Sequence, residues 1–137
     1  MAKTFYFSVV APDGQVLGKD VEFVVVPSLA GEIGVLPNHA PLVAGLDIGV
    51  IRYTDEGVVR KIAISGGFME VANNKVTVLA KTAEKAEDID VERAKAAKAM
   101  AEKRLRERTP DVDVLRAEVA LRRAIARLKA AGQYSER

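Results

Sequence analysis

The chain of 137 residues contains no cysteine, and its single histidine is His39. The absence of cysteine excludes disulfides, thiolate metal ligands and a cysteine nucleophile. One imidazole without a second histidine or nearby carboxylates is a poor metal site, and no serine or threonine lies in a nucleophile motif that it serves. The composition therefore predicts no catalytic residues, no metal site and a chain that is not an enzyme by itself. It leaves His39 a structural or interface role.

Long hydrophobic runs are missing too. No apolar segment approaches the roughly 20 residues that a membrane-spanning helix needs, and the first residues lack the apolar core of a signal peptide. We therefore expect any membrane association to go through a partner. The 49% of hydrophobic and 29% of charged residues are an ordinary balance for a globular chain.

Glycine, proline and charge are unevenly distributed along the chain. Residues 1–80 contain nine of the ten glycines and carry a net charge of −2, whereas residues 81–137 carry a net charge of +4. This change of composition predicts two different structures joined near residue 81. We place the two domains at residues 1–84 and 85–137.

The first part has the pattern of an all-β domain. Apolar residues alternate from Phe5 to Val9, which predicts a strand with one buried face, and Pro27 predicts the end of a strand or an edge strand. Turn signals separate the remaining segments: Asp13-Gly14, Asp55-Glu56-Gly57 and Asn73-Asn74. Strands at this spacing without intervening helices favour antiparallel pairing in two packed layers, a β-sandwich.

Two glycine-containing segments interrupt the alternation. The segment from Gly31 to Pro41 holds two glycines and two prolines, so we expect a long loop or a bulged connection. Gly66-Gly67 lacks the spacing and the lysine of a phosphate-binding loop, and a strand is expected to follow it. We therefore expect a glycine bulge inside a sheet.

The second part predicts an antiparallel α-helical hairpin. Strong helix formers predominate from Asp90 onward, and Asp90 and Asp113 are suitable N-cap residues for two helices. The first helix should end near Arg108, because the residue before Pro110 disfavours helical backbone angles. The second should end near Gly132. The short connection between them makes the helices antiparallel.

Small apolar residues recur along one face of each expected helix. In the first helix they are Ala94, Ala97, Ala101 and Leu105; in the second they are Ala117, Leu121, Ala124, Leu128 and Ala131. Because alanine buries little apolar area, we expect the hairpin to be held weakly and to be able to open.

Arginines gather on one face of the second expected helix. Arg123 and Arg127 form a like-charge pair at i and i+4, which costs a few tenths of a kcal/mol unless an anion lies between them. The face fits a solvated basic surface, a module for an acidic protein surface, or a phosphate site. Nucleic acid is a weaker candidate, because acidic residues are interspersed and no aromatic stacking platform accompanies the arginines.

Three motifs together resemble the epsilon subunit of a bacterial F-type ATP synthase. They are Gly31-Glu32-x-Gly-x-Leu36-Pro37-x-His39-x-Pro41, Ser65-Gly66-Gly67-Phe68-x-Glu70-Val71 and Ile89-Asp90-x-x-Arg93-Ala94. The resemblance covers essentially the whole chain, and the order of parts, sandwich and then hairpin, is the same. The first two motifs are specific. The third is not, because Asp113 and Arg116 repeat its pattern.

The resemblance implies a non-catalytic rotor subunit of the central stalk. In the family, the sandwich docks on the gamma subunit and on the ring of membrane c subunits, and so couples ion-driven rotation to ATP synthesis elsewhere in the complex. The hairpin can lie folded against the sandwich, or it can extend into the catalytic alpha/beta assembly and inhibit ATP hydrolysis. The expected location is the cytoplasmic face of the cell membrane, reached only through the complex. We expect partner contacts at Glu32, His39, Arg116 and Arg122.

In several bacterial relatives the folded hairpin also binds ATP as a regulatory ligand, and the resemblance implies no required cofactor. The matching positions here are Glu84, Ile89, Asp90, Arg93, Ala94, Arg123 and Arg127. Some relatives have a further arginine where this chain has Met100, so we expect a lower affinity for ATP.

Overall fold

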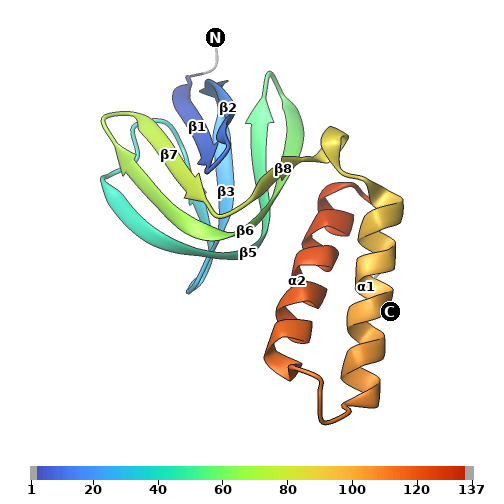
Figure 1. The fold of residues 1–137 in the computed structure, drawn as a ribbon. Coiled ribbons are helices and arrows are strands. Elements are labelled where there is room, and N and C mark those ends of the chain that lie inside the picture. The colour runs from blue at the N-terminus through green and yellow to red at the C-terminus, as the bar shows by residue number, and fades with distance from the viewer. Residues whose placement is uncertain (1–2, 135–137) are drawn as a thin grey trace.

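The computed structural model describes residues 3–134 and places the strands before the helices (Figure 1). Their bounds are β1 Phe5–Ala11, β2 Gly14–Val21, β3 Phe23–Ser28, β4 Gly31–Val35, β5 Leu42–Asp55, β6 Val58–Ala72, β7 Lys75–Ala80, β8 Ala83–Lys85, the 3₁₀ helix η1 Ala86–Asp88, α1 Val91–Glu107 and α2 Val114–Ala130. The chain is thus a β-sandwich followed by a helical hairpin, which confirms the predicted fold class.

The strands follow the order β2-β1-β7-β6-β5-β3-β4, with β8 paired to β6. The long strands β5 and β6 curve, so the sheet folds over on itself around one core (Figure 1). Neighbouring strands are antiparallel except for β1 and β7, which are parallel. The prediction of purely antiparallel pairing is wrong for this pair. No hairpin turn connects these two strands, so no turn dictates their relative direction.

Turn chemistry is as predicted at two of the three turns; at the first, Asp13 has no positive φ, and Gly14, with a φ of 130°, already begins β2. Glu56 and Gly57 have φ of 51° and 78°, and Asn73 and Asn74 have φ of 51° and 58°. These left-handed angles give two-residue turns the twist of the strands that they join. Residues of both layers then meet in the core, where the rings of Phe7 and Tyr53 lie 5.7 Å apart.

The prediction of a long loop from Gly31 to Pro41 is wrong in its first half, because Gly31–Val35 is strand β4. Ile33 packs against the core and Val35 is fully buried, so the period of two is present despite the glycines. Pro27 neither ends strand β3 nor places it at an edge, since β3 lies between β4 and β5. The pairing of β3 with β5 shifts between Val25 and Ser28, and the missing N–H of Pro27 falls within that interruption.

The predicted bulge at Gly66-Gly67 is also wrong. Leu46 pairs with Gly67 and Ile48 pairs with Ser65, so the register of β6 on β5 is unchanged across the two glycines. Gly67 has a φ of 147°, and a Cβ there would lie 2.0 Å from the carbonyl oxygen of Leu79. Glycine is therefore required by the close approach of β7.

Both helices begin and end as their sequence predicts. The carboxylate of Asp90 accepts a hydrogen bond from the Arg93 amide at 3.1 Å, and that of Asp113 accepts one from the Arg116 amide at 3.0 Å. Each thus satisfies a backbone donor that the first helical turn leaves free. α1 ends at Glu107 and α2 at Ala130.

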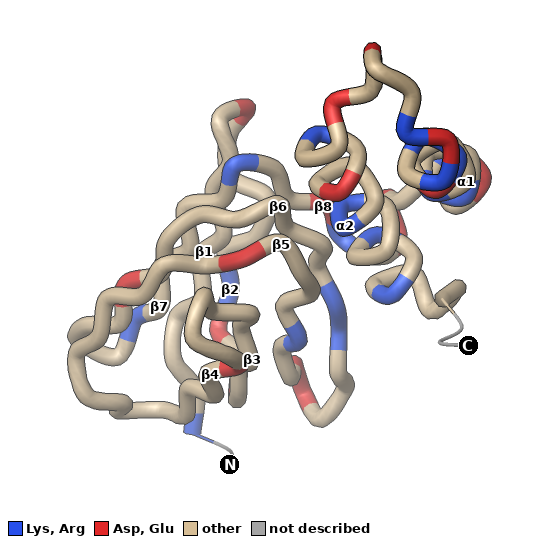
Figure 2. The backbone as a smooth tube through the Cα atoms, turned by 90° about the horizontal axis from the view of Figure 1, so that it is seen from below, with Lys and Arg blue, Asp and Glu red and all other residues tan. Residues whose placement is uncertain are grey.

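Helix α2 lies between the sandwich and α1 (Figures 1 and 2). It packs on β5 and β6 on one side and on α1 on the other, and α1 packs chiefly on α2. The buried residues of the two helices are almost all alanine: Ala94 and Ala101 in α1, and Ala117, Ala124, Ala126, Leu128 and Ala130 in α2.

One predicted seam residue, Ala97, is exposed instead. Lys98 is half-buried in its place, with its ammonium group 3.1 Å from Glu102. Consecutive helical residues are rotated by about 100°, so a seam through Ala94, Lys98 and Ala101 leaves Ala97 to one side.

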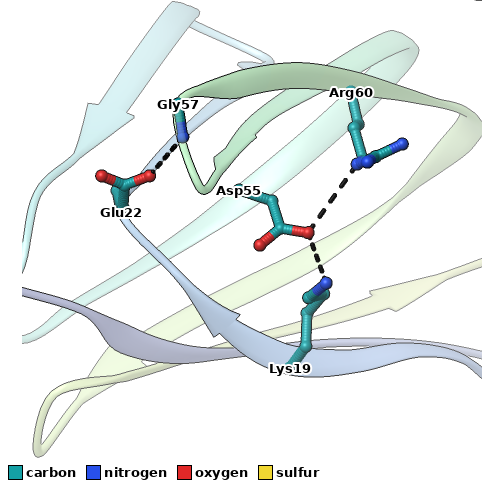
Figure 3. A network of polar contacts seen from close by, with 5 residues as sticks. All are labelled: Lys19, Glu22, Asp55, Gly57 and Arg60. Carbon is teal, nitrogen blue, oxygen red and sulfur yellow. Dashed lines mark hydrogen bonds and ion pairs between the residues drawn. The ribbon is translucent and has the colours of Figure 1, made fainter.

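A polar network holds β2 against the β5–β6 hairpin (Figure 3). The carboxylate of Asp55, which is only 8% exposed, accepts a hydrogen bond from Lys19 and lies 3.7 Å from the Nε atom of Arg60. Glu22 accepts a hydrogen bond from the Gly57 amide at 2.7 Å. The network therefore joins the end of β2 to the tip of the hairpin.

Substituting Asp55 by asparagine should lower the free energy of unfolding by about 1.5–3 kcal/mol, the value of a hydrogen bond to a charged group. The hydrogen bond to Asp55 raises the pKa of Lys19 above its ordinary value of 10.5. The stabilisation is therefore complete below that value and is lost as the pH rises through the folded-state pKa. Urea unfolding at neutral and strongly alkaline pH measures both effects. The exposed neighbour Asp20→Asn serves as the control, and an equal loss in the two variants would contradict the prediction.

Candidate functional site

A cavity of about 880 Å³ lies where the sandwich meets the helices. The sandwich contributes the β1–β2 turn, residues 11–16, and the segment Lys81–Glu84 to its lining. The rest comes from Asp88, from the start of α1 and from Arg127 of α2. This volume lies within the range of small-molecule sites.

The structure brings most of the predicted ATP-binding residues together at this cavity. Glu84, Asp90, Arg93, Ala94 and Arg127 all line it. They come from β8, the start of α1 and the last turn of α2, so the site exists only while the hairpin is folded against the sandwich.

The other two predicted residues lie elsewhere. Arg123 lines a small adjoining recess, whose walls also include Thr82 and Arg127. The Ile89 side chain is buried in a separate cluster with Ala63 and Ala130, and it does not line the cavity. As the apolar residue before the N-cap, Ile89 fastens the start of α1 to the sandwich and to the end of α2.

The charges of the site are partly compensated. The Nε atom of Arg127 donates to a carboxylate oxygen of Glu84 at 2.5 Å. Within residues 3–134, neither Arg93 nor Arg123 forms an ion pair. Carboxylates line the cavity as well, those of Asp13, Glu84, Asp88 and Asp90. The guanidinium groups of Arg93, in the cavity, and of Arg123, in the adjoining recess, are therefore the ones without an ion pair that a bound anion can engage.

Sequence reasoning missed the β1–β2 turn and Lys81 as parts of this site. Asp13-Gly14 was identifiable as a turn, but no spacing in the sequence shows that it faces a helix about 80 residues later. In the described part of the chain, no group of three or more acidic or histidine side chains could hold a metal ion, and no helix is long and apolar enough to cross a membrane.

The residues predicted to contact partner subunits differ in whether their side chains already bind another residue of this chain. Arg52 donates to both carboxylate oxygens of Glu32, at 2.8 and 3.4 Å. His39 is half-buried, with its Nδ1 atom 2.7 Å from the carbonyl oxygen of Ala40. Arg116 is exposed and has no ion pair among the described residues, whereas Arg122 donates to Asp47 at 2.7 Å. Arg122 therefore fastens α2 to β5 in the folded form.

Burial raises the pKa of Asp47, but the hydrogen bonds from Arg122 and the Ile48 amide and the charge of Arg122 outweigh it. The pKa of Asp47 is therefore below its ordinary value of 3.8. A lowered pKa means that the ionised carboxylate stabilises the fold above that value, and the stabilisation is lost as the pH falls through the folded-state pKa. The docking of α2 should weaken in that acidic range.

Asp47→Asn should weaken the docking of α2 at neutral pH by about 0.5–1 kcal/mol, as expected for a half-exposed ion pair. The amides of α2 should then exchange hydrogen about two to five times faster. Glu118→Gln, a change of the same charge on the exposed face of α2, is the control. If both variants exchange at the rate of the unmodified chain, the ion pair does not hold the helix.

A separate feature lies on the outer face of the sandwich, away from the cavity. Four exposed apolar side chains form what we call the apolar stripe: Leu29, Val43, Phe68 and Leu79, which are 72%, 72%, 64% and 56% exposed. Phe68 pairs with Leu79 across β6 and β7, and Leu29 donates its amide to the Gly45 carbonyl beside Phe68. Several large apolar groups gathered on one face are typical of a protein contact surface.

Two family models match the chain in succession. The beta-sandwich domain of the ATP synthase delta/epsilon chain matches residues 4–86, and the long alpha-helix domain of the same chain matches residues 87–132. The chain is 60% identical over 131 residues to the ATP synthase epsilon chain of Desulfitobacterium hafniense strain Y51, covering 96% of this chain and 98% of the relative. It is 59% identical to that of Carboxydothermus hydrogenoformans, covering 97% and 99%.

Solved structures agree with these matches. A chain in the mitochondrial ATP synthase of Euglena gracilis, solved as OSCP, F1 and c-ring, superposes with a TM-score of 0.78 at 27% identity, over 93% of this chain and 81% of that one. A chain from the central stalk and c-ring of the Tetrahymena thermophila enzyme gives a TM-score of 0.60 at 13% identity, over 95% of this chain and 98% of that one, which shows a shared fold.

Proposed function

The chain belongs to the epsilon chains of bacterial ATP synthase, and from this premise we propose that it is a rotor subunit of the central stalk with two regulatory properties. The sandwich docks it in the complex and transmits ion-driven rotation, and the hairpin restrains ATP hydrolysis. ATP bound at the cavity keeps the hairpin folded. Through these contacts the subunit is held at the cytoplasmic face of the cell membrane.

The apolar stripe supports the docking proposal. It offers the gamma subunit a surface of large apolar groups on a rigid sheet, where an interface core is expected to be apolar. The neighbouring segment with Glu32 and His39 offers polar contacts for the c ring. The apolar stripe does not include the hairpin, so docking through it does not require the helices, although Glu32 borders α2 in the folded form.

The arginines of α2 support the inhibition proposal. Arg116 and Arg123 are exposed and have no ion pair among the described residues, while Arg122 and Arg127 hold the folded form. Opening the hairpin frees all four for carboxylates on the catalytic alpha and beta subunits. A nucleic-acid role has less support, because two of the four charges are neutralised within the chain.

One reconstitution tests docking and inhibition together. A chain ending at Asp88, combined with the gamma, alpha, beta and c subunits, should assemble like the full chain and should raise the rate of ATP hydrolysis several-fold. The full-length variant Arg116→Ala with Arg123→Ala keeps the helices and removes only two of their charges. It should raise the rate of ATP hydrolysis by less than the truncation does. Failure of the truncated chain to assemble would overturn docking by the sandwich. An unchanged hydrolysis rate in a normal assembly would overturn inhibition by the hairpin.

The cavity carries the ATP proposal, because it joins sandwich, linker and both helices around the guanidinium groups of Arg93 and Arg127, next to the recess that Arg123 lines. Arg93, Arg123 and Arg127 would bind the phosphates, Asp90 would accept hydrogen bonds from the ribose or the base, and Glu84 would release Arg127. ATP would bind only the folded form and so would stabilise it by about 2.7 kcal/mol at a hundredfold excess over Kd. Scarce ATP would then release the inhibitory helices.

A further inference from the structure

The β4–β5 connection, residues 36–41, is held by a side chain from a distant part of the chain. Asn74 lies in the turn between β6 and β7, and its Oδ1 atom accepts a hydrogen bond from the Asn38 amide at 2.8 Å. Its Nδ2 atom donates to the Thr4 carbonyl oxygen at 3.0 Å. One asparagine therefore joins the connection, the β6–β7 turn and the segment that leads into β1.

These hydrogen bonds depend on the side chain of Asn74 and not on its backbone angle alone. Asn74 has a φ of 58° and its neighbour Asn73 has a φ of 51°, left-handed angles that glycine and asparagine adopt most readily. Glycine at either position therefore keeps the turn. Only at position 74 does it also remove the bond to Asn38, because the Asn73 side chain forms no hydrogen bond within residues 3–134.

The connection carries an exposed apolar side chain at the end of the sandwich. Val35 is 1% exposed, whereas Leu36, the first residue of the connection, is 60% exposed. The half-buried His39 follows, and the chain then enters β5, where Val43 belongs to the apolar stripe. The β6–β7 turn lies on the far side of the sandwich from the helices (Figure 1). The exposed apolar surface therefore continues from the stripe onto this end, whether the hairpin is folded or open.

We propose that Asn74 is a positioning residue for docking on the c ring, because its side chain holds the β4–β5 connection in place. Leu36 then supplies an apolar contact and His39 a polar one in a fixed arrangement. This inference rests on the proposed docking of the sandwich in the complex. The apolar stripe covers the outer face of the sheet and the connection lies at its end, so a gamma subunit on the face leaves the end to the second partner.

Pre-organisation is the physical reason for this role. A flexible connection must be ordered when it binds, and the cost of ordering it is subtracted from the affinity. A hydrogen bond between neutral groups changes such an equilibrium by about two- to tenfold. The connection lies outside the buried core, so the loss of this bond should weaken docking without unfolding the sandwich.

The dissociation rate of the full chain from an assembly of gamma subunit and c ring tests the proposal. Asn74→Gly should dissociate about fivefold faster than the unmodified chain, the effect of one lost hydrogen bond on a rate of release. Its dissociation from gamma alone should not change. Asn74→Asp keeps the acceptor for the Asn38 amide and should dissociate at about the unmodified rate. Asn73→Gly, the matched change in the same turn, should behave like the unmodified chain.

A double-mutant cycle separates positioning from direct contact. Leu36→Ala removes the apolar contact and should speed dissociation from the same assembly about tenfold. Adding Asn74→Gly to it should then have less than its own effect, because that effect passes through the connection. Full additivity would show that Asn74 itself contacts the partner and would overturn the positioning role.

Hydrogen exchange of the Asn38 amide in the free chain checks that the connection has been released. Exchange should be faster in Asn74→Gly and unchanged in Asn73→Gly, and equal rates in both would show that the side chain does not hold the connection. If Asn38 exchanges faster but dissociation is unchanged, docking stands and the positioning role is wrong. An equal loss with gamma alone overturns the assignment to the c ring. If the unmodified chain does not bind the assembly at all, the proposed docking fails as well.

Discussion

Replacing Gly67 by alanine should lower the free energy of unfolding by about 4 kcal/mol. The φ of 147° at this position is unfavourable for any residue with a Cβ, at roughly 1–3 kcal/mol. The added methyl group would also lie 2.0 Å from the Leu79 carbonyl oxygen and 2.9 Å from the Ala80 Cα atom. Both are backbone atoms of β7, so β7 must move away, which costs roughly another 1–3 kcal/mol.

Gly31→Ala is the matched control for this prediction. Gly31 has a φ of 118°, but nothing lies within 4 Å of a Cβ built on it. The loss of stability in Gly31→Ala should therefore come from the unfavourable backbone angle alone. Urea unfolding of both variants separates the two contributions, and equal losses of stability at Gly31 and Gly67 would show that β7 does not press on Gly67.

Arg127→Ala should lower the affinity for ATP about a hundredfold, the loss expected for two charge-assisted hydrogen bonds in a half-buried site. Arg127 borders both the cavity and the recess that holds Arg123. Its removal also leaves the Glu84 carboxylate without its partner at 2.5 Å, so that an anion faces the incoming phosphates. Calorimetry on the isolated chain measures the loss, and Arg123→Ala should lower the affinity as well.

Two further variants make this result specific. Arg116→Ala removes the same charge from α2 outside the cavity and should leave the affinity unchanged. Adding Glu84→Gln to Arg127→Ala removes the repelling carboxylate and should restore part of the lost affinity. If the unmodified chain releases no heat even with millimolar ATP, the binding proposal is wrong, and the Asp90 and Arg93 motif does no more than start a helix.

Features set by neighbouring residues were predictable from the sequence. The turns at Glu56-Gly57 and Asn73-Asn74 and the helix caps at Asp90 and Asp113 depend on a few adjacent residues, and all four are confirmed. The grouping of Glu84 with Arg127 was reached through family resemblance, because no local pattern relates residues so far apart in the chain.

The errors share one physical cause, since each depends on what a distant strand or helix does. Gly31–Val35 is a strand because β3 pairs with it, and Gly67 is a glycine because β7 lies against it. Ala97 is exposed because the face of α1 that packs on α2 runs through Ala94, Lys98 and Ala101. The position of the β1–β2 turn beside α1 could not be predicted for the same reason, because only the docking of the hairpin creates it.

The alanine-rich packing of the hairpin has a thermal consequence. The heat-capacity change of a transition grows with the apolar area that it exposes, by about 0.45 cal/K/mol per Å². Release of helices whose buried residues are alanine, with Leu128 as the exception, exposes little such area. The enthalpy of release should therefore stay nearly constant with temperature, and a van't Hoff plot of the open and closed populations should be straight. Warming then shifts the fraction of closed hairpins steadily in one direction, without the intermediate optimum that the stability curve of the sandwich must have.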